Sequence, residues 1–355
     1  MPVEIFICYA RKDQLLLNEL KAHLIPLQRQ GRIMIWADTD IGAGTEWEKE
    51  IKKHLDTSDM ILLLVSSDFM NSDYCYGIEM KRALERHERN EARVIPIILR
   101  PVHWQEAPFG KLQALPTDAK PVTDPFWHNL DIAFYDVTEG IRVVVNEEER
   151  RRKAEEERRR IKIWMEKGNT HYLAKKYKEA LAAFEQVIKL VPNSIEAYFR
   201  KGVTLNALKR HEEALAAFEQ IIKLHPFYAD AYNSKGDALS NLKRYKEASV
   251  AYEQAIELDP SYPEAYNGKG CVLSYLERDE EALVAFEQAI ELQSNYAEAY
   301  YNKSFTLEHL GRATGAKHAK QTARDLGFSS QETQETIGNY LTGSVLEQLW
   351  FVSFV

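Results

Sequence analysis

The sequence has few of the features that mark secreted, membrane or metal-binding proteins. Its 355 residues include three cysteines, Cys8, Cys75 and Cys271, and no two of them stand at a CxxC or other metal-ligand spacing. We therefore expect reduced thiols, no metal and a cytoplasmic protein. The longest apolar runs, such as 60–65 and 94–99, are too short to span a bilayer, and no signal-peptide pattern opens the chain. We expect no membrane association.

A basic excess is also missing. The net charge is −8, whereas nucleic-acid-binding domains are usually basic, so we do not expect nucleic acid as a partner. A GxxxxGK[ST] loop is absent as well, which disfavours nucleotide hydrolysis by that route. Hydrophobic residues make up 45% of the chain. This fraction is typical of globular proteins, and the length indicates two or three domains.

The second half of the chain repeats itself every 34 residues. Small residues at this step allow two helices to approach closely, an aromatic residue fills the space between units, and a proline cannot continue a helix. The recurring positions are Gly168, Gly202, Gly236 and Gly270; Ala180, Ala214, Ala248 and Ala282; Phe184, Phe218, Tyr252 and Phe286; and Pro192, Pro226 and Pro260. The pattern resembles the tetratricopeptide repeat (TPR) family.

This register predicts four full units and a degenerate fifth, in which Ser304 replaces the glycine and Lys320 replaces the aromatic residue. Terminal repeats are often atypical because they cap the stack. The resemblance implies an all-α solenoid whose concave face binds a protein or peptide partner, or else a constitutive scaffold. The predicted units are 161–194, 195–228, 229–262, 263–296 and 297–328. Residues 329–355 lose the pattern, and the role of this tail stays open.

A highly charged run, EEERRRKAEEERRR at 147–160, precedes the repeats. Glutamate stands four residues before arginine several times, for example Glu147 before Arg151, an order that stabilises a helix. The acidic residues nearly cancel the basic ones, which favours a connecting helix over a nucleic-acid patch. We therefore predict a linker at 146–160 between a first domain, 1–145, and the repeats.

Residues 1–145 alternate short apolar runs with amphipathic stretches. This alternation predicts a parallel sheet with helices on both faces, and in such sheets ligands bind at the carboxyl ends of the strands. The strand candidates are 5–8, 32–36, 60–65 and 94–99, and the helix candidates are 13–30, 46–57 and 76–90. The segments 9–13, 37–45 and 66–76 should therefore surround a site.

Four segments resemble the signature boxes of Toll/interleukin-1 receptor (TIR) domains, in the family's order. They read EIFICYARKD, WADTDIGAGTEW, SSDFMNSDYCYGIE and PIILRPVHW. Cys8 stands where the family more often has Ser, and Tyr74 stands where it often has Trp. The resemblance covers about 1–145 and implies a flavodoxin-like α/β fold with a parallel five-stranded sheet.

The resemblance also implies one of two functions. Some TIR domains recruit other TIR domains, and others cleave the nicotinamide–ribose bond of NAD+. The enzymes carry an aromatic residue, a cysteine and, after three residues, a glutamate; here these are Tyr74, Cys75 and Glu79. Fold alone does not decide between the two functions.

One carboxylate suffices for this reaction. Nicotinamide leaves as a neutral molecule and needs no proton, while positive charge develops on the ribose in an oxocarbenium-like transition state. A carboxylate such as Glu79 can hold the ribose hydroxyls and stabilise that charge. The alternative is that Glu79 is an exposed residue on a charged helix. A Cys75 nucleophile is disfavoured because the sequence offers it no evident general base.

The resemblance places further NAD+-binding residues around Glu79. Arg11 contacts a phosphate or is a surface charge, Asp38 binds ribose or organises a turn, and Trp47 is a core residue or a stacking platform, as is Trp36. The predicted binding residues are Tyr9, Ala10, Arg11, Asp38, Gly42, Trp47, Tyr74 and Cys75. Gly42 and Gly44 belong to a mobile loop, and in related domains a neighbouring protomer completes the site.

The leading interpretation is an NAD+ nucleosidase, hydrolase or cyclase, with NAD+ as substrate and no cofactor. TIR self-association would activate it, and the repeats would bind a partner or drive oligomerisation in bacterial antiviral defence or NAD+ depletion. The alternative is a non-catalytic TIR–TPR adaptor that only binds proteins.

Overall fold

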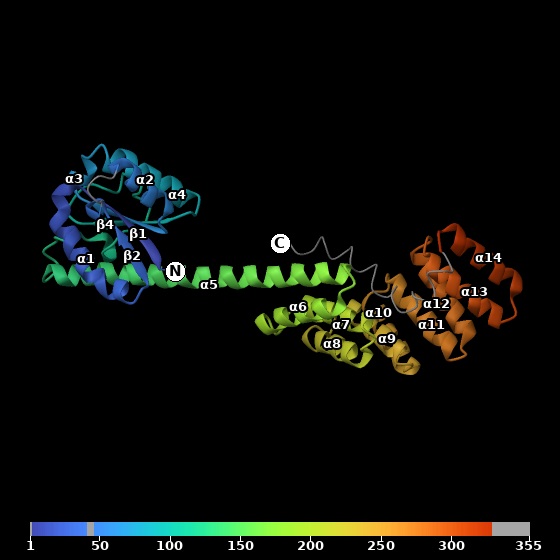
Figure 1. Cartoon of the computed structure of the whole chain (residues 1–355). Coiled ribbons are helices and arrows are strands. Elements are labelled where there is room, and N and C mark those ends of the chain that lie inside the picture. The colour runs from blue at the N-terminus through green and yellow to red at the C-terminus, as the bar shows by residue number, and fades with distance from the viewer. Residues whose placement is uncertain (1, 41–45, 329–355) are drawn as a thin grey trace. The chain divides into compact units, whose positions relative to one another are not determined.

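The computed structural model describes residues 2–40 and 46–328 (Figure 1). The chain divides into two compact units, Met1–Glu156 and Glu157–Val355, each described by itself below. Two parts of the sequence predictions lie outside the described residues: the loop glycines Gly42 and Gly44, and the tail 329–355.

The N-terminal unit is built on a parallel sheet with the strand order β2-β1-β3-β4. The strands are β1 (Val3–Cys8), β2 (Ile33–Trp36), β3 (Met60–Val65) and β4 (Arg93–Ile98), each close to its predicted position. Phe6 of the central strand β1 lies opposite Trp36 on one side and Ile61 on the other. All residues of β3 are buried, as expected of a strand covered on both faces.

Among the residues that the structure describes, the sheet has four strands. The prediction of a fifth strand is therefore wrong for this part of the chain. The free side of β4 makes one isolated bridge, between Ile97 and Leu115. Leu115 N donates to Pro96 O, and Ile98 N donates to Leu115 O, both at 2.8 Å. The next donor of such a ladder, Thr117 N, donates instead to Asp136 Oδ1 at 2.6 Å, and Ile98 O accepts from Val122 N at 2.8 Å, so the pairing stops after one bridge.

Helices cover both faces of the sheet. On one face, α1 packs with the start of α5 through buried residues such as Leu20 and Phe134. On the other, α2 and α4 pack through Ile51 and Ala83. The helices are α1 (Gln14–Arg29), α2 (Trp47–Thr57), α3 (Ser67–Met70), α4 (Met80–Glu88) and α5 (Leu130–Leu173), with a π turn at Cys75–Glu79 and 3-10 turns at Arg11–Asp13, Asp38–Asp40 and Thr117–Ala119. The predicted α/β class is confirmed.

The charged run at 147–160 lies inside α5, a helix of 44 residues. The boundary between the two compact units falls within this run. Its first part binds the N-terminal unit, because Arg32 Nη2 lies 2.8 Å from Glu149 Oε2 and Arg152 pairs with Asp59. This part of the run is therefore more than a solvated connection.

The C-terminal unit consists of antiparallel helix pairs in the predicted register (Figure 1). After the end of α5 they are α6 (Tyr177–Leu190), α7 (Ile195–Ala207), α8 (His211–Leu224), α9 (Ala229–Asn241), α10 (Tyr245–Leu258), α11 (Pro263–Tyr275), α12 (Asp279–Leu292), α13 (Ala297–His309) and α14 (Ala313–Asp325). The all-α prediction is confirmed.

The recurring glycines allow the two helices of a unit to pack closely, as their spacing predicts. A Cβ on Gly202 would lie 2.6 Å from the ring of Phe218, and one on Gly270 would lie 2.6 Å from the ring of Phe286. Only a residue without a side chain allows this approach, so the period of the sequence is the period of helix packing. In the fifth unit, Ser304 takes the glycine position and is fully buried.

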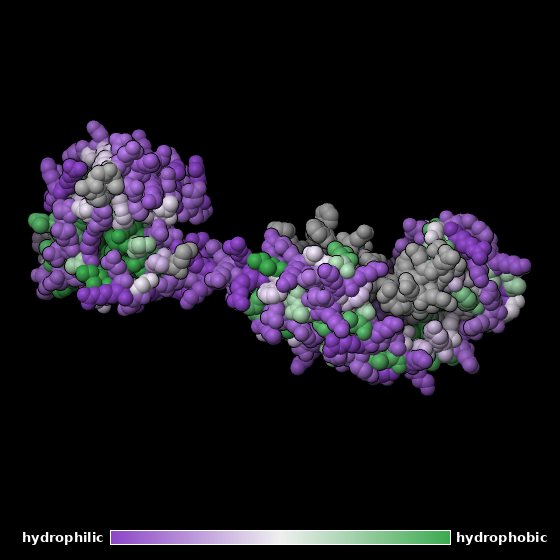
Figure 2. All heavy atoms as spheres, in the orientation of Figure 1, coloured by the Kyte–Doolittle hydropathy of each residue, from purple (hydrophilic) through white to green (hydrophobic). Residues whose placement is uncertain are grey.

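Figure 2 shows hydrophilic side chains over most of the viewed face of both units, with smaller apolar areas between them. Among the described helices, none combines the length and the apolar character that crossing a membrane requires.

Candidate functional site

A cavity of about 440 Å³ lies at the carboxyl ends of β1, β2 and β3. This is the edge at which parallel α/β sheets bind ligands. Every predicted site residue that the structure describes lines it: Tyr9, Ala10, Arg11, Asp38, Trp47, Tyr74, Cys75 and Glu79. Gly42 lies outside the described residues. The structure thus brings these residues together, while their roles stay predictions.

Glu79 reaches the cavity from a π turn. The backbone N–H groups of Ile78 and Glu79 both donate to the carbonyl oxygen of Tyr74, at 2.9 and 3.1 Å. The wider turn Cys75–Glu79 then leads directly into α4. Such turns are rare in proteins overall, and those that occur are often found at functional sites. Glu79 is 5% exposed, so the alternative of an exposed surface glutamate is wrong.

The nearest partner of the Glu79 carboxyl group is the thiol of Cys8, at the end of β1. Cys8 Sγ donates to Glu79 Oε2 at 2.6 Å. Burial raises the pKa of Glu79 to about 8, and the charges of Cys75 and Asp38 act in the same direction, while the hydrogen bond from Cys8 opposes them. Burial also raises the pKa of Cys8. The sequence alone did not indicate Cys8 as a site residue; its signal was the unusual cysteine in the first box.

Cys75 opens the π turn on the wall of the cavity. Its Sγ donates to the carbonyl oxygen of Tyr9 at 3.3 Å, and its backbone N–H donates to Ser72 Oγ at 3.1 Å. The hydrogen bond with Cys8 lowers the pKa of Cys75 to about 7. Ligand atoms of Cys8, Cys75 and Glu79 all lie within 4.8 Å of one another.

Asp38 adds a second carboxylate to the cavity. It begins the 3-10 turn that follows β2, and its Oδ1 is buried without a hydrogen-bond partner among the described residues. The hydroxyl of Tyr9 donates to Gln14 Oε1 at 2.7 Å. Burial is the largest cause of the raised pKa of Tyr9, and the neighbouring Asp38 is the second largest. A buried oxygen without a partner is costly, so this one is available to a ligand.

The aromatic residues divide between the core and the cavity. Trp36 stacks between Phe6 and His54, with ring centroids 5.4 and 4.3 Å away, and is a packing residue. Trp47, the first residue of α2, lies 4.8 Å from the ring of Tyr74, and both rings line the cavity.

An ion pair between the buried Asp13 and the partly exposed Arg100 fixes the strand ends around the site, and it was not predicted from the sequence. Asp13 is fully buried. Its Oδ2 accepts a hydrogen bond from Ser66 Oγ at 2.5 Å, and its Oδ1 lies 3.1 Å from Arg100 Nη2. Because these residues follow β1, β3 and β4, the contacts hold three strand ends together. The Asp of the first box was the available signal.

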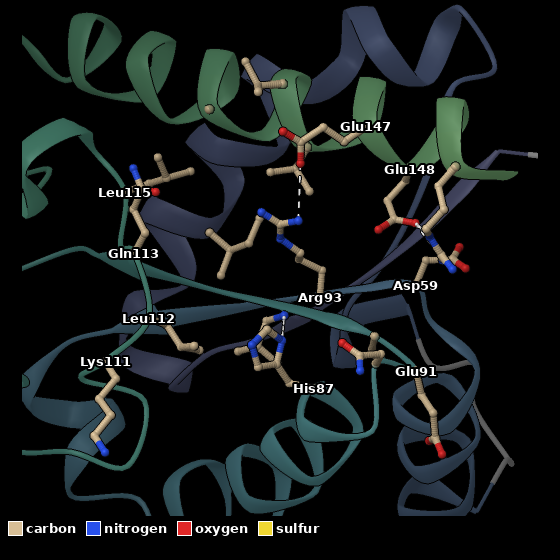
Figure 3. A pocket seen from close by; sticks show the side chains of 18 of the residues that line it. Asp59, His87, Glu91, Arg93, Lys111, Leu112, Gln113, Leu115, Glu147 and Glu148 are labelled. Atoms are coloured by element: carbon tan, nitrogen blue, oxygen red, sulfur yellow. Dashed lines mark hydrogen bonds and ion pairs between the residues drawn. The ribbon is translucent and has the colours of Figure 1, made fainter. Parts of the chain in front are cut away.

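A second cavity, of about 700 Å³, lies at the amino ends of β3 and β4 (Figure 3). Arg93 points toward Glu147, with Nη1 3.3 Å from Oε2 (Figure 3). Glu148 pairs with Arg151 at 2.8 Å. The ring of His87 accepts a hydrogen bond from the backbone of Val94. This cavity is larger than the first, but these charged side chains neutralise one another.

Comparison with known proteins identifies both units. A TIR domain model matches residues 5–125, and tetratricopeptide repeat models match 165–229, 229–262, 251–284 and 285–318. The chain is a TIR domain followed by tetratricopeptide repeats. The TIR–TPR chain is 51% identical over 138 residues to the uncharacterised protein y4lF of Sinorhizobium fredii (strain NBRC 101917 / NGR234). The match covers 39% of this chain and 42% of that relative.

Among solved structures, the TIR–TPR chain is similar to the MamA protein, with 22% identity, a TM-score of 0.42, and coverage of 50% of this chain and 95% of that one. It is also similar to YrrB, a TPR protein with an unusual peptide-binding site, with 22% identity, a TM-score of 0.39, and coverage of 48% and 89%.

Proposed function

We propose that the TIR unit cleaves the nicotinamide–ribose bond of NAD+ and that Glu79 is its catalytic carboxylate. One observation carries the proposal: Glu79 is a buried carboxyl group in the wall of a cavity at the ligand-binding edge of the sheet. The eight described residues that the TIR motifs predicted all line that cavity. Cavities with a few convergent polar groups and a perturbed carboxyl group are the default candidates for active sites.

The cavity suits a reaction in which positive charge develops. It holds the carboxyl groups of Glu79 and Asp38, while its cations stay at the rim: Arg11 is exposed, and Lys12 pairs with Asp68 at 2.8 Å. The cationic nicotinamide ring and the oxocarbenium-like ribose would both be stabilised by such a site. A bound cation also favours the ionised form of a nearby acid.

The remaining lining residues supply the contacts that NAD+ requires. The unpartnered Oδ1 of Asp38 can accept a ribose hydroxyl. The rings of Trp47 and Tyr74, tilted by 39° to each other, offer aromatic faces for the nicotinamide, and Arg11 offers a charge for the pyrophosphate. Self-association of TIR domains would complete the site and activate cleavage to ADP-ribose or a cyclic isomer.

The repeats supply the second half of the proposal. TPR arrays bind proteins or peptides, and partner binding would raise the local concentration of TIR units. We propose a role in bacterial defence through NAD+ depletion or a cyclic signal. A non-catalytic TIR–TPR adaptor is the alternative function.

Nicotinamide release by the purified full-length protein tests the proposal. The protein is incubated with NAD+ over a concentration series and with a crowding agent, beside Glu79→Ala and the control Glu85→Ala. Glu85 lies on α4, the helix that directly follows the π turn of Glu79, and its side chain is 55% exposed. We expect Glu79→Ala to lose at least about 100-fold in rate and Glu85→Ala to match the wild type. Equal release from Glu79→Ala and wild type would overturn the assignment, and no release under any condition would favour the adaptor.

A further inference from the structure

We propose that Cys8, Cys75 and Glu79 form a binding site for a thiophilic divalent cation, Zn²⁺. The cation would occupy the floor of the same cavity and block NAD+ cleavage; this last clause rests on the proposed function, whereas the binding itself does not.

The three side chains come from two well-anchored elements. Cys8 ends the central strand β1, and Cys75 and Glu79 are the first and last residues of the π turn. They are 1%, 8% and 5% exposed, and one ligand atom of each lies within 4.8 Å of the others. Within residues 2–40 and 46–328, no other group of three or more potential metal ligands comes this close together.

The donor set and its dimensions suit zinc. Zn²⁺ is bound in proteins by thiolate, imidazole and carboxylate groups, at roughly 2.3 Å for sulfur and about 2.0–2.2 Å for oxygen. Tetrahedral angles at those bond lengths place sulfur and oxygen about 3.6 Å apart. The present distance from Cys8 Sγ to Glu79 Oε2 is 2.6 Å. Binding therefore requires the two atoms to separate by about 1 Å, which a rotation of the Glu79 carboxyl group would have to supply.

The cavity supplies an entry path and the fourth ligand position. Cys75 and Glu79 line it, whereas Cys8 does not line it and is buried against the carboxyl group of Glu79. A cation entering from the cavity would meet Cys75 and Glu79 first and would reach Cys8 once the Glu79 carboxyl group turned aside. It would keep one position open to water, as in zinc sites with three protein ligands. The hydrogen bond from the backbone of Cys75 to Ser72 Oγ fixes the start of the π turn and so the direction of the Cys75 side chain.

The surrounding charges favour a cation. Asp38 lines the same cavity and has a buried oxygen without a partner among the described residues. The lining cations Arg11 and Lys12 are both exposed. A metal bound by Glu79 would hold the carboxylate that the ribose needs, so Zn²⁺ and productively bound NAD+ would exclude each other.

Binding is tested on the metal-free full-length protein in a thiol-free reductant, without NAD+. Zn²⁺ is titrated against a chromogenic chelator, and Co²⁺ is titrated while the near-ultraviolet thiolate-to-cobalt absorption is followed. We expect one ion per chain in the wild type and in the control Cys271→Ser, which removes the cysteine of the repeats. We expect loss of this ion in Cys8→Ser and in Cys75→Ser, with circular dichroism and thermal melting showing that both variants fold. Should either variant fail to fold, Glu79→Gln removes the third donor instead.

No ion in the wild type would overturn the proposal, as would equal affinity in Cys8→Ser, Cys75→Ser and Cys271→Ser. NAD+ cleavage is then measured with and without Zn²⁺. Inhibition of the wild type and Cys271→Ser that a chelator reverses supports mutual exclusion, and full activity with Zn²⁺ bound contradicts it. Zinc binding by a chain that never cleaves NAD+ supports the metal site while the proposed function fails; cleavage by a chain that binds no zinc overturns the metal site alone.

Discussion

Glu79 in the TIR unit and Asp237 in the repeats are both buried carboxyl groups, and burial raises the pKa of each to about 8. Their surroundings differ. Asp237 accepts a hydrogen bond at 2.7 Å from Tyr252, whose side chain is itself buried in the packing of the repeats. Glu79 lines a cavity and its partner is a thiol. A raised pKa therefore reports burial, and only access to a cavity makes a buried acid a candidate for chemistry.

The two cavities described in the TIR unit also differ in how their acidic side chains are paired. The larger one, at the amino ends of the strands, has acids such as Glu147 and Glu148 that pair with arginines. The smaller one, at the carboxyl ends, holds Glu79 and an unpartnered oxygen of Asp38. What distinguishes the smaller cavity is neither its volume nor its net charge: within the described part of the chain, Glu79 and Asp38 form no ion pair, and the proposed function rests on this difference.

The largest effect on stability is expected from Arg100→Ala. This change leaves the fully buried Asp13 carboxylate with Ser66 as its hydrogen-bond partner. Removing one partner of a buried ion pair costs about 3 kcal/mol or more, and because the Arg100 side chain is 39% exposed we expect a smaller loss, about 1–3 kcal/mol. Urea denaturation followed by tryptophan fluorescence measures it. The control Lys12→Ala removes an ion pair whose lysine is 79% exposed, and we expect it to cost less than about 1 kcal/mol; equal losses would show that Asp13 does not depend on Arg100.

Asp237→Asn should stabilise the repeats at high pH. The pKa of Asp237 in the folded protein is raised to about 8, with Glu298 and Glu264 adding to the effect of burial and Tyr252 opposing it. The folded state thus keeps a proton that the unfolded state loses, and stability falls as the pH rises from about 4 to 8. Asparagine has no proton to lose and can still accept from Tyr252.

We therefore expect Asp237→Asn to match the wild type near pH 4 and to gain on the order of 2 kcal/mol in free energy of unfolding above pH 8. Urea denaturation followed by far-ultraviolet circular dichroism at both pH values measures this. A variant that is less stable than the wild type at high pH would mean that the ionised carboxylate of Asp237 stabilises the repeats, which is the opposite of what we expect.

The smallest effect is expected from Glu147→Ala in the larger cavity. Glu147 and Arg93 are both about half exposed, at 47% and 48% of the side chain. Exposed ion pairs contribute about 0–1 kcal/mol, so the free energy of unfolding and the rate of nicotinamide release should both stay close to wild type. A large loss of activity would give the second cavity a role that its paired charges do not suggest.

The repeats and the strands could be predicted because their signals are local. The glycine–aromatic contacts recur at the sequence period, and β3 is a continuous apolar run. The floor of the site could not be predicted in the same way, since Cys8 and Glu79 lie 71 residues apart and meet only through the fold. The π turn could not be predicted from the sequence either, because it differs from an α-helix only in its hydrogen-bond pattern. The predicted fifth strand reduces to one bridge beside Pro116.

The role of Glu79 is best measured by the rate of nicotinamide release from NAD+ in two matched variants, one in each cavity. Glu79→Gln and Glu147→Gln both replace a carboxylate with its amide and keep the side-chain shape. We expect Glu79→Gln to lose at least about 100-fold in rate and Glu147→Gln to keep the wild-type rate. Equal rates for the two variants would show that the buried carboxyl group of the smaller cavity does not carry the chemistry.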